Sequence, residues 1–192
     1  MPIPVAGTSG LAAEGGGVSF EDTTGLGDIT FFSFLAPPTE GNFKYGAGPV
    51  VRFPTATDDD LGGGKLTVGP GGVALYSTAD YTLGLLNLNY FSVAGESGES
   101  VSTSTLQYFA FYNFTPEWGI GTAPIISYNW VADDDDDKLA LPVGLGVTHT
   151  FKAGDFPARL LLEGQHYVVQ RDSFGPEWNV RLAFGLFLPS LF

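Results

Sequence analysis

Few residues in this chain could support catalysis, and its two histidines are the strongest candidates. His149 and His166 are the only histidines in 192 residues, and cysteine is absent. A hydrolase of the Ser–His type needs a serine and an acid arranged around the histidine, and no serine motif accompanies either one. Strand alternation places both on an apolar face near strand ends, where interfacial packing is expected. We therefore predict that the protein is not an enzyme.

Two acidic runs could bind a cation. TDDDLGGGK covers residues 57–65 and ADDDDDK covers residues 132–138. Ca²⁺ takes several oxygen ligands, but neither run has the alternating ligands, central Gly and closing Glu of an EF-hand loop. The preferred interpretation is a pair of solvated acidic loops that associate weakly with cations near lipopolysaccharide phosphates. The weak metal candidates are Asp58, Asp59, Asp60, Asp133, Asp134 and Asp135, and no cofactor is predicted.

The composition restricts the class of protein. The net charge is −13, from 8 basic and 21 acidic residues, which argues against nucleic-acid binding because that affinity comes largely from Lys and Arg on phosphates. No stretch approaches 18 uninterrupted apolar residues, so the pattern does not predict a membrane-spanning helix. The 27 Gly, 13 Pro and 14% aromatic residues disfavour helices and favour β-structure.

Alternation of apolar residues with polar or small ones predicts about nine strands. They are longer than the roughly 5–6 residues of an ordinary strand, and a tilted transmembrane strand needs about 9–11. The alternative is a soluble antiparallel sandwich or lipocalin-like barrel, which alternates as well. The expected strands are 25–36, 42–53, 64–77, 80–94, 101–114, 117–131, 138–152, 156–170 and 176–189.

Polar and apolar residues of these segments fall on opposite faces. In 156–170, Arg159, Glu163 and Gln165 share one face, whereas Leu160 and Leu162 share the other. This arrangement is typical of a barrel with a polar interior and an apolar exterior. The polar residues expected to line the lumen are Asp28, Lys44, Arg52, Asn87, Asn89, Gln107, Arg159, Glu163, Gln165 and Arg181, mixed with Phe32, Phe109, Phe111, Leu161 and Phe187.

The connections fall into two classes. If the last strand runs toward the periplasm, the periplasmic turns are the short PPTEGN, STAD, FTPE and KAGDFP. The outer connections then include the longest and most acidic segments, as in outer-membrane barrels. The predicted fold is all-β, an antiparallel up-and-down transmembrane β-barrel that occupies residues 25–192 after a flexible Gly-rich lead over residues 1–24.

The C-terminal strand carries an apolar series that ends on an aromatic residue. It resembles the C-terminal signal by which the outer-membrane assembly machinery recognises barrel proteins. The residues that carry this resemblance are Phe184, Leu186, Leu188 and Phe192, and Pro189 and Ser190 depart from it.

Several longer phrases resemble one family. They include GLGDIT (25–30), YGAGPVVRFPTATDDDLGGGKLTVGPGGVAL (45–75) and LPVGLGVTHTFKAGDFPARLLLEGQHYVV (141–169). The family is the Gram-negative outer-membrane transporters often labelled phenol-degradation MetA-pathway or neuromedin-U-like proteins. Its members carry a signal peptide and further strands before GLGD, so the resemblance implies that this sequence is truncated at its N-terminus.

The sequence and the resemblance together suggest one leading function and one alternative. The leading expectation is passive transport of small hydrophobic or aromatic molecules across the cell outer membrane. The expected partners are the lipid bilayer, lipopolysaccharide, the assembly machinery and small hydrophobic solutes. The alternative is a structural or surface barrel that does not conduct, with acidic outer loops that bind cations.

Overall fold

The computed structural model describes residues 26–57, 62–95, 100–170 and 177–186. These residues form ten antiparallel strands and one short 3₁₀ turn, η2 (Asp135–Asp137). No helix in the described ranges is long and apolar enough to cross a membrane. The strands are β1 (Ile29–Phe32), β2 (Phe43–Phe53), β3 (Lys65–Ser77), β4 (Tyr81–Gly95), β5 (Ser102–Asn113), β6 (Trp118–Thr122), β7 (Ile125–Asn129), β8 (Leu139–Ala153), β9 (Phe156–Val169) and β10 (Trp178–Leu186).

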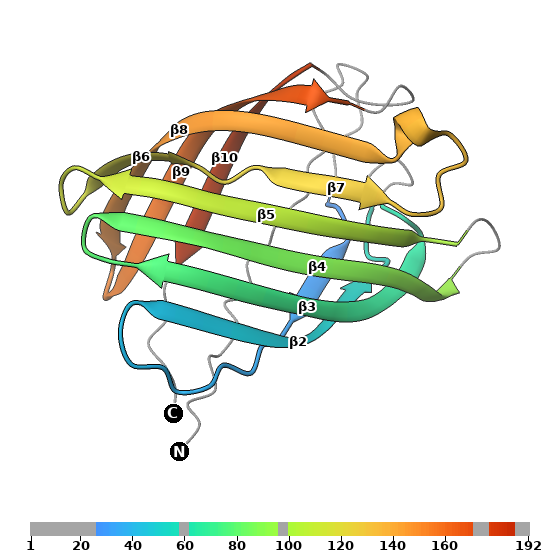
Figure 1. The fold of residues 1–192 in the computed structure, drawn as a ribbon, viewed down its shortest axis with the longest axis horizontal. Helices are drawn as coiled ribbons and strands as arrows, with labels where there is room; N and C mark the ends of the chain where they lie inside the picture. The colour runs from blue at the N-terminus through green and yellow to red at the C-terminus, as the bar shows by residue number, and fades with distance from the viewer. Residues whose placement is uncertain (1–25, 58–61, 96–99, 171–176, 187–192) are drawn as a thin grey trace.

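The strands pair as an antiparallel meander. The order is β1-β2-β3-β4-β5-β6-β8-β9-β10, with β7 paired to β5 and β8. β6 and β7 follow one another between β5 and β8, and each pairs with both of them. The pairing of these four strands therefore closes on itself as a small ring, with β1 to β4 on one side and β9 and β10 on the other. Figure 1 shows the sheet curled into a barrel, with β2 to β5 across the front and β9 and β10 behind them.

The observed strands follow the alternation in the sequence with one main exception. The segment 117–131, expected as one strand, is divided into β6 and β7 at Ala123 and Pro124. Proline has no N–H to donate and interrupts a ladder in mid-sheet. Pro124 and Pro142, the latter on the neighbouring β8, are both fully buried, and a register shift lies at Leu141/Pro142. β1 is also shorter than the expected segment 25–36.

The two faces of the sheet differ in polarity. Among the described residues, only eight hydrophobic residues are buried, whereas thirty-one large apolar side chains are exposed. Two adjacent residues of β9 show this difference: the apolar Leu162 is 54% exposed and the charged Glu163 is 0% exposed. The barrel is therefore largely apolar on its outer face.

Two apolar clusters pack inside the barrel. The first contains Phe34, Val50, Leu88 and Tyr90, and it joins the segment after β1 to β2 and β4. The second contains Phe111, Ala123 and Leu161, and it joins β5 to β9 across the break between β6 and β7. Side chains therefore fill much of the interior that the strands enclose.

Candidate functional site

Glu163 lies at the centre of a buried polar cluster on the inner wall. Its Oε1 accepts hydrogen bonds from Thr122 Oγ1 at 2.6 Å and from the Ala123 N–H at 2.9 Å, and Gln165 Nε2 donates to its Oε2 at 2.9 Å. Gly144 leaves room for this carboxylate, since an added Cβ there would lie 2.8 Å from Oε1. A buried carboxylate is tolerable when its oxygens are hydrogen-bonded in this way.

The same cluster satisfies the backbone at the strand break. Ala123 lies between β6 and β7, outside the paired registers of both. Its N–H donates to Glu163, and its carbonyl accepts from Gln107 Nε2 at 2.8 Å and from Arg181 Nη1. The inner polar residues Gln107, Glu163, Gln165 and Arg181 therefore converge on one point, where they replace the missing ladder bonds.

Two arginines of the inner wall lie against aromatic rings. The Arg52 guanidinium carbon is 3.8 Å from the centroid of Tyr90, and that of Arg159 is 5.3 Å from the centroid of Phe111. Such cation–π contacts hold the guanidinium in place. Lys44 has the same inward parity on β2 and is exposed at the strand end. The inner wall is thus mixed, with cations beside aromatic surface.

Asp28 organises a loop rather than the middle of the barrel wall. Its Oδ1 accepts from the N–H groups of Thr55 and Ala56, each at 3.1 Å, and its Oδ2 accepts from Gly63 N–H at 2.9 Å. An adjacent bond runs from Ile29 N–H to Thr55 Oγ1 at 2.9 Å. The Asp of GLGD therefore joins β1 to both ends of the loop between β2 and β3.

Asn87 and Asn89 do not lie on the inner wall, where the sequence analysis expected them. They share the face of Leu85, which is 49% exposed, whereas Leu88 and Tyr90 point inward and are buried. Both asparagines are therefore on the outer face, and the prediction that they line the lumen is wrong.

The hydrogen bonds of Asn87 and Asn89 explain how the outer face accommodates them. Asn89 Nδ2 donates to Asn87 Oδ1 and to the Pro70 carbonyl, and its Oδ1 accepts from Ser104 Oγ. Ser104 in turn accepts from Trp130 Nε1 at 2.8 Å. This chain of contacts satisfies polar groups on a surface that is otherwise apolar, and no sequence signal predicted it.

A shallow groove of about 470 Å³ opens beside the asparagines. Its floor contains the small residues Ala47, Gly72 and Ala74, and Asn87 supplies its polar edge. Ala47 pairs with Gly72, and Ala74 with Leu85, so these residues share the outer face. The groove therefore lies on the outside of the barrel.

The two histidines pack against tryptophans on the outer face. The rings of His149 and Trp118 stack with centroids 4.2 Å apart, and those of His166 and Trp178 are 4.6 Å apart. His149 Nδ1 is buried with no hydrogen-bond partner in the described part of the chain, and His166 Nδ1 is 3.0 Å from the carbonyl oxygen of Glu177. The groups in contact with them are aromatic rings and a backbone carbonyl rather than a serine and an acid.

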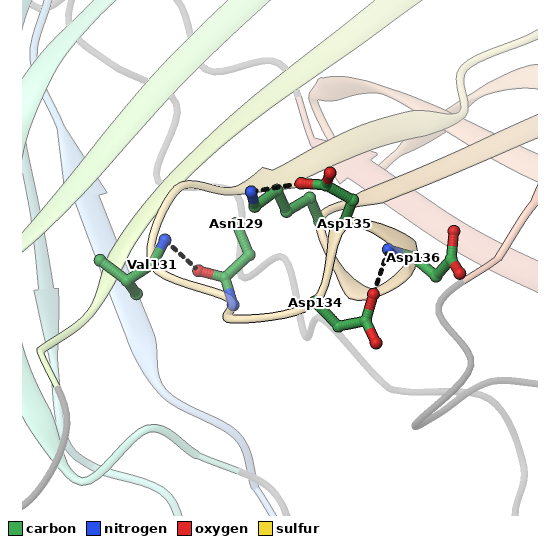
Figure 2. Close-up of polar contacts among 6 residues, drawn as sticks. Asn129, Val131, Asp134, Asp135 and Asp136 are labelled. Atoms are coloured by element: carbon green, nitrogen blue, oxygen red, sulfur yellow. Dashed lines mark hydrogen bonds and ion pairs between the residues drawn. The ribbon is translucent and has the colours of Figure 1, made fainter.

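The acidic connection before β8 is ordered by its own side chains (Figure 2). Asp134 Oδ1 accepts from the Asp136 N–H at 3.2 Å and caps η2. Lys138 Nζ donates to Asp135 Oδ1 at 2.5 Å. This hydrogen bond and the ammonium charge hold the pKa of the Asp135 carboxyl below its ordinary value and raise the pKa of Lys138.

The metal and assembly candidates lie partly within the described residues. Asp133, Asp134 and Asp135 are exposed, and the described residues contain no cluster of three or more His, Asp or Glu that could hold an ion. Phe184 is 60% exposed on the outer face of β10, and Leu186 ends that strand. The candidates Asp58, Asp59, Asp60, Leu188 and Phe192, together with the expected lining residue Phe187, lie outside the described residues.

Comparison of the chain with protein-family models, with curated proteins and with solved structures finds no match.

Proposed function

We propose that this protein is an outer-membrane β-barrel that passively transports small hydrophobic or aromatic molecules. The observation that carries the proposal is the inverted polarity of the sheet, with its large apolar side chains outside and Glu163 and Gln165 buried inside. Soluble monomers rarely expose apolar patches above a few hundred Å². A lipid environment removes the cost of this outer face, because lipid tails are as apolar as the side chains themselves.

The height of the apolar belt supports the same environment. Tyr81 and Phe91 are the outermost exposed aromatic residues of β4. At about 3.4 Å per residue they are separated by about 34 Å along the strand, and a tilt of about 45° reduces this to a height of about 24 Å. The apolar band of outer-membrane barrels is about 25 Å tall.

The exposed aromatic residues gather toward the ends of this belt. Near the short turns they are Phe43, Tyr45, Tyr76, Tyr81, Tyr112, Phe114, Trp118, Phe151, Phe156 and Phe184, and near the longer connections they are Phe31, Phe53, Phe91, Trp130 and Trp178. Between them the exposed residues are aliphatic and include Leu83, Leu85, Ile120, Leu145, Leu162 and Leu182. Two aromatic girdles around an aliphatic band are typical of membrane barrels.

The transport part of the proposal depends on the inner wall and on the family resemblance. The guanidiniums of Arg52 and Arg159 lie beside aromatic rings, which gives a solute both apolar and polar contacts. The resemblance of the GLGD and FPTATDDDLGGGK phrases to outer-membrane transporters adds to this. No catalytic activity is proposed, and the bilayer, lipopolysaccharide and the assembly machinery are the proposed partners.

A barrel that does not conduct is the second candidate. The interior clusters around Val50 and Phe111 and the fully buried Glu163 favour it, because they fill space that a channel would need. In that case the protein is structural or surface-directed, and its acidic loops associate with cations.

Purification and conductance measurements test the proposal in two steps. The chain should require detergent and give a β-rich circular dichroism spectrum, and a monodisperse monomer without detergent would refute the membrane assignment. In planar bilayers the refolded protein should give discrete channel events or admit small aromatic solutes into vesicles. Insertion into bilayers with neither activity would favour the structural barrel.

A further inference from the structure

Charge is divided between the strands and their connections. Six of the eight basic residues lie in strands at inward positions, whereas Glu163 is the only acidic residue in any described strand. The four short turns each carry one exposed acid: Glu40, Asp80, Glu117 and Asp155. The inward basic residues are Lys44, Arg52, Lys65, Lys152, Arg159 and Arg181. The inner wall is therefore electropositive within an acidic protein.

Arg159 is the inward cation whose contacts point to a ligand. Its Nη2 donates to Asn113 Oδ1 at 2.7 Å, and its Nε donates to Thr150 Oγ1 at 3.3 Å. Both partners are neutral, the Phe111 ring lies against the guanidinium, and Arg159 has no carboxylate partner among the described residues. A partly buried cation without a counter-ion is unfavourable, so an anion bound at this position would be stabilised.

The surroundings of Arg159 define the kind of anion. A guanidinium has five N–H donors in a planar fork that matches a carboxylate. The hydrogen bonds to Asn113 and Thr150 leave donors for a carboxylate. Lys152 has the same inward parity as Thr150, two residues further along β8, and brings a second cation to this end. Phe111 and Leu161 supply buried apolar surface beside the charge.

We propose that Arg159 and Lys152 bind the carboxylate of a small aromatic acid at the end of the inner wall near the short turns. The proposal rests on the proposed transport function and narrows its solutes from small hydrophobic or aromatic molecules in general to aromatic carboxylates. Rings of Arg and Lys select anions in other pores by the same electrostatic means.

Binding of benzoate and of its neutral counterpart benzyl alcohol tests the site. Each is titrated by saturation-transfer NMR into the full chain refolded in micelles, at constant ionic strength. Wild type should bind benzoate at least about tenfold more tightly than benzyl alcohol, the range expected for a hydrogen bond to a charged group. Arg159→Gln should weaken benzoate binding about tenfold or more and leave benzyl alcohol binding unchanged.

Lys138→Gln is the matched control, because it removes the same charge from an exposed loop, and it should leave both affinities unchanged. If Arg159→Gln does not fold by circular dichroism, Arg159→Lys keeps the charge without the planar fork and should weaken benzoate binding several-fold. Equal wild-type affinities for the two probes would overturn the site, as would full benzoate affinity in a folded Arg159 variant.

The failures of the two proposals are distinguishable. Benzoate binding that depends on Arg159, in a protein that passes no solute, would contradict transport and support the site. A conducting protein whose wild type binds the two probes equally would support transport and overturn the site.

Discussion

Strands β4 and β9 arrange their polar residues in opposite ways. On β9, Glu163 and Gln165 point inward and are buried, and Leu162 is exposed. On β4, Leu88 and Tyr90 are buried inside, and the asparagines of the same strand lie on the outer face. Both strands belong to one antiparallel sheet with the same alternation of faces.

The difference lies in the partners that each polar group finds. Glu163 faces the strand break, where Thr122 and Ala123 have donors that need an acceptor. Asn89 faces the carbonyl of Pro70 on one side and the Ser104 hydroxyl on the other. A polar residue can therefore occupy either face if hydrogen bonds satisfy it, and polarity alone does not determine which way a strand faces.

The largest loss of stability is expected on substitution of Glu163. Glu163→Ala removes the acceptor for Thr122 and Ala123 and leaves a buried N–H without a partner, so it should lower the free energy of unfolding by about 3–5 kcal/mol. Urea unfolding in micelles measures this change. The control is Leu162→Ala on the outer face of the same strand, for which the loss should be below about 1 kcal/mol, and equal losses would contradict the assignment of faces.

The free-energy cost of a charge on the outer face of β9 should depend on how deep in the bilayer the charge lies. Leu162→Arg places a cation at mid-height and should cost about 2–4 kcal/mol in vesicles, whereas Val168→Arg near the strand end should cost about 0–1 kcal/mol. Both side chains are more than half exposed, so a protein whose outer face contacts water would show a small cost for each. Unfolding of the two variants in lipid vesicles distinguishes these outcomes.

A smaller effect is expected from the outer asparagine of β4. Asn89→Leu removes hydrogen bonds to Asn87, Pro70 and Ser104 and should cost about 1 kcal/mol. Combination with Ser104→Ala should cost less than the sum of the two single changes, because they share one hydrogen bond. Strict additivity in urea unfolding would indicate that the contact contributes nothing.

The smallest change in stability is expected from a substitution in the acidic loop before β8. Lys138→Gln should return the Asp135 pKa upward toward its ordinary value, which carboxyl NMR titration detects. The free energy of unfolding should not change measurably, because Asp135 is exposed and the pair lies at the surface. The lowered Asp135 pKa stabilises the wild type above the ordinary carboxyl range, and this contribution disappears as the pH falls through the lowered value. An unchanged Asp135 pKa in the variant would show that the contact with Lys138 does not form in solution.

Most of the strand arrangement was predictable from the sequence, because its periodicity is strong. Seven of the nine expected segments correspond to observed strands with small differences at their ends. The segment 25–36 contains only the shorter β1, and 117–131 is divided in two. The division depends on Pro124 and on Pro142, which lies on a different strand. Which side chains replace the missing ladder bonds depends on contacts that alternation does not encode.

The inner wall was predictable only where the polar residues of a strand lie on one face. Alternation places Arg159, Glu163 and Gln165 together, and the structure has them inward. It fails for Asn87, because the sequence LNLNY places polar residues opposite apolar ones that prove to be the interior core. The outer hydrogen bond from Trp130 to Ser104 joins β5 to the end of β7 and depends on cross-strand register.

The depth of the three tryptophans in a bilayer tests the membrane assignment most directly. Trp118 lies at the turn end of the belt, and Trp130 and Trp178 lie at the opposite end. Quenching of their fluorescence by lipids brominated at different depths should place each about 12 Å from the bilayer centre, half the height of an apolar band. Leu162→Trp in a tryptophan-free background should lie near the centre. Tryptophans that brominated lipids do not quench would contradict the assignment.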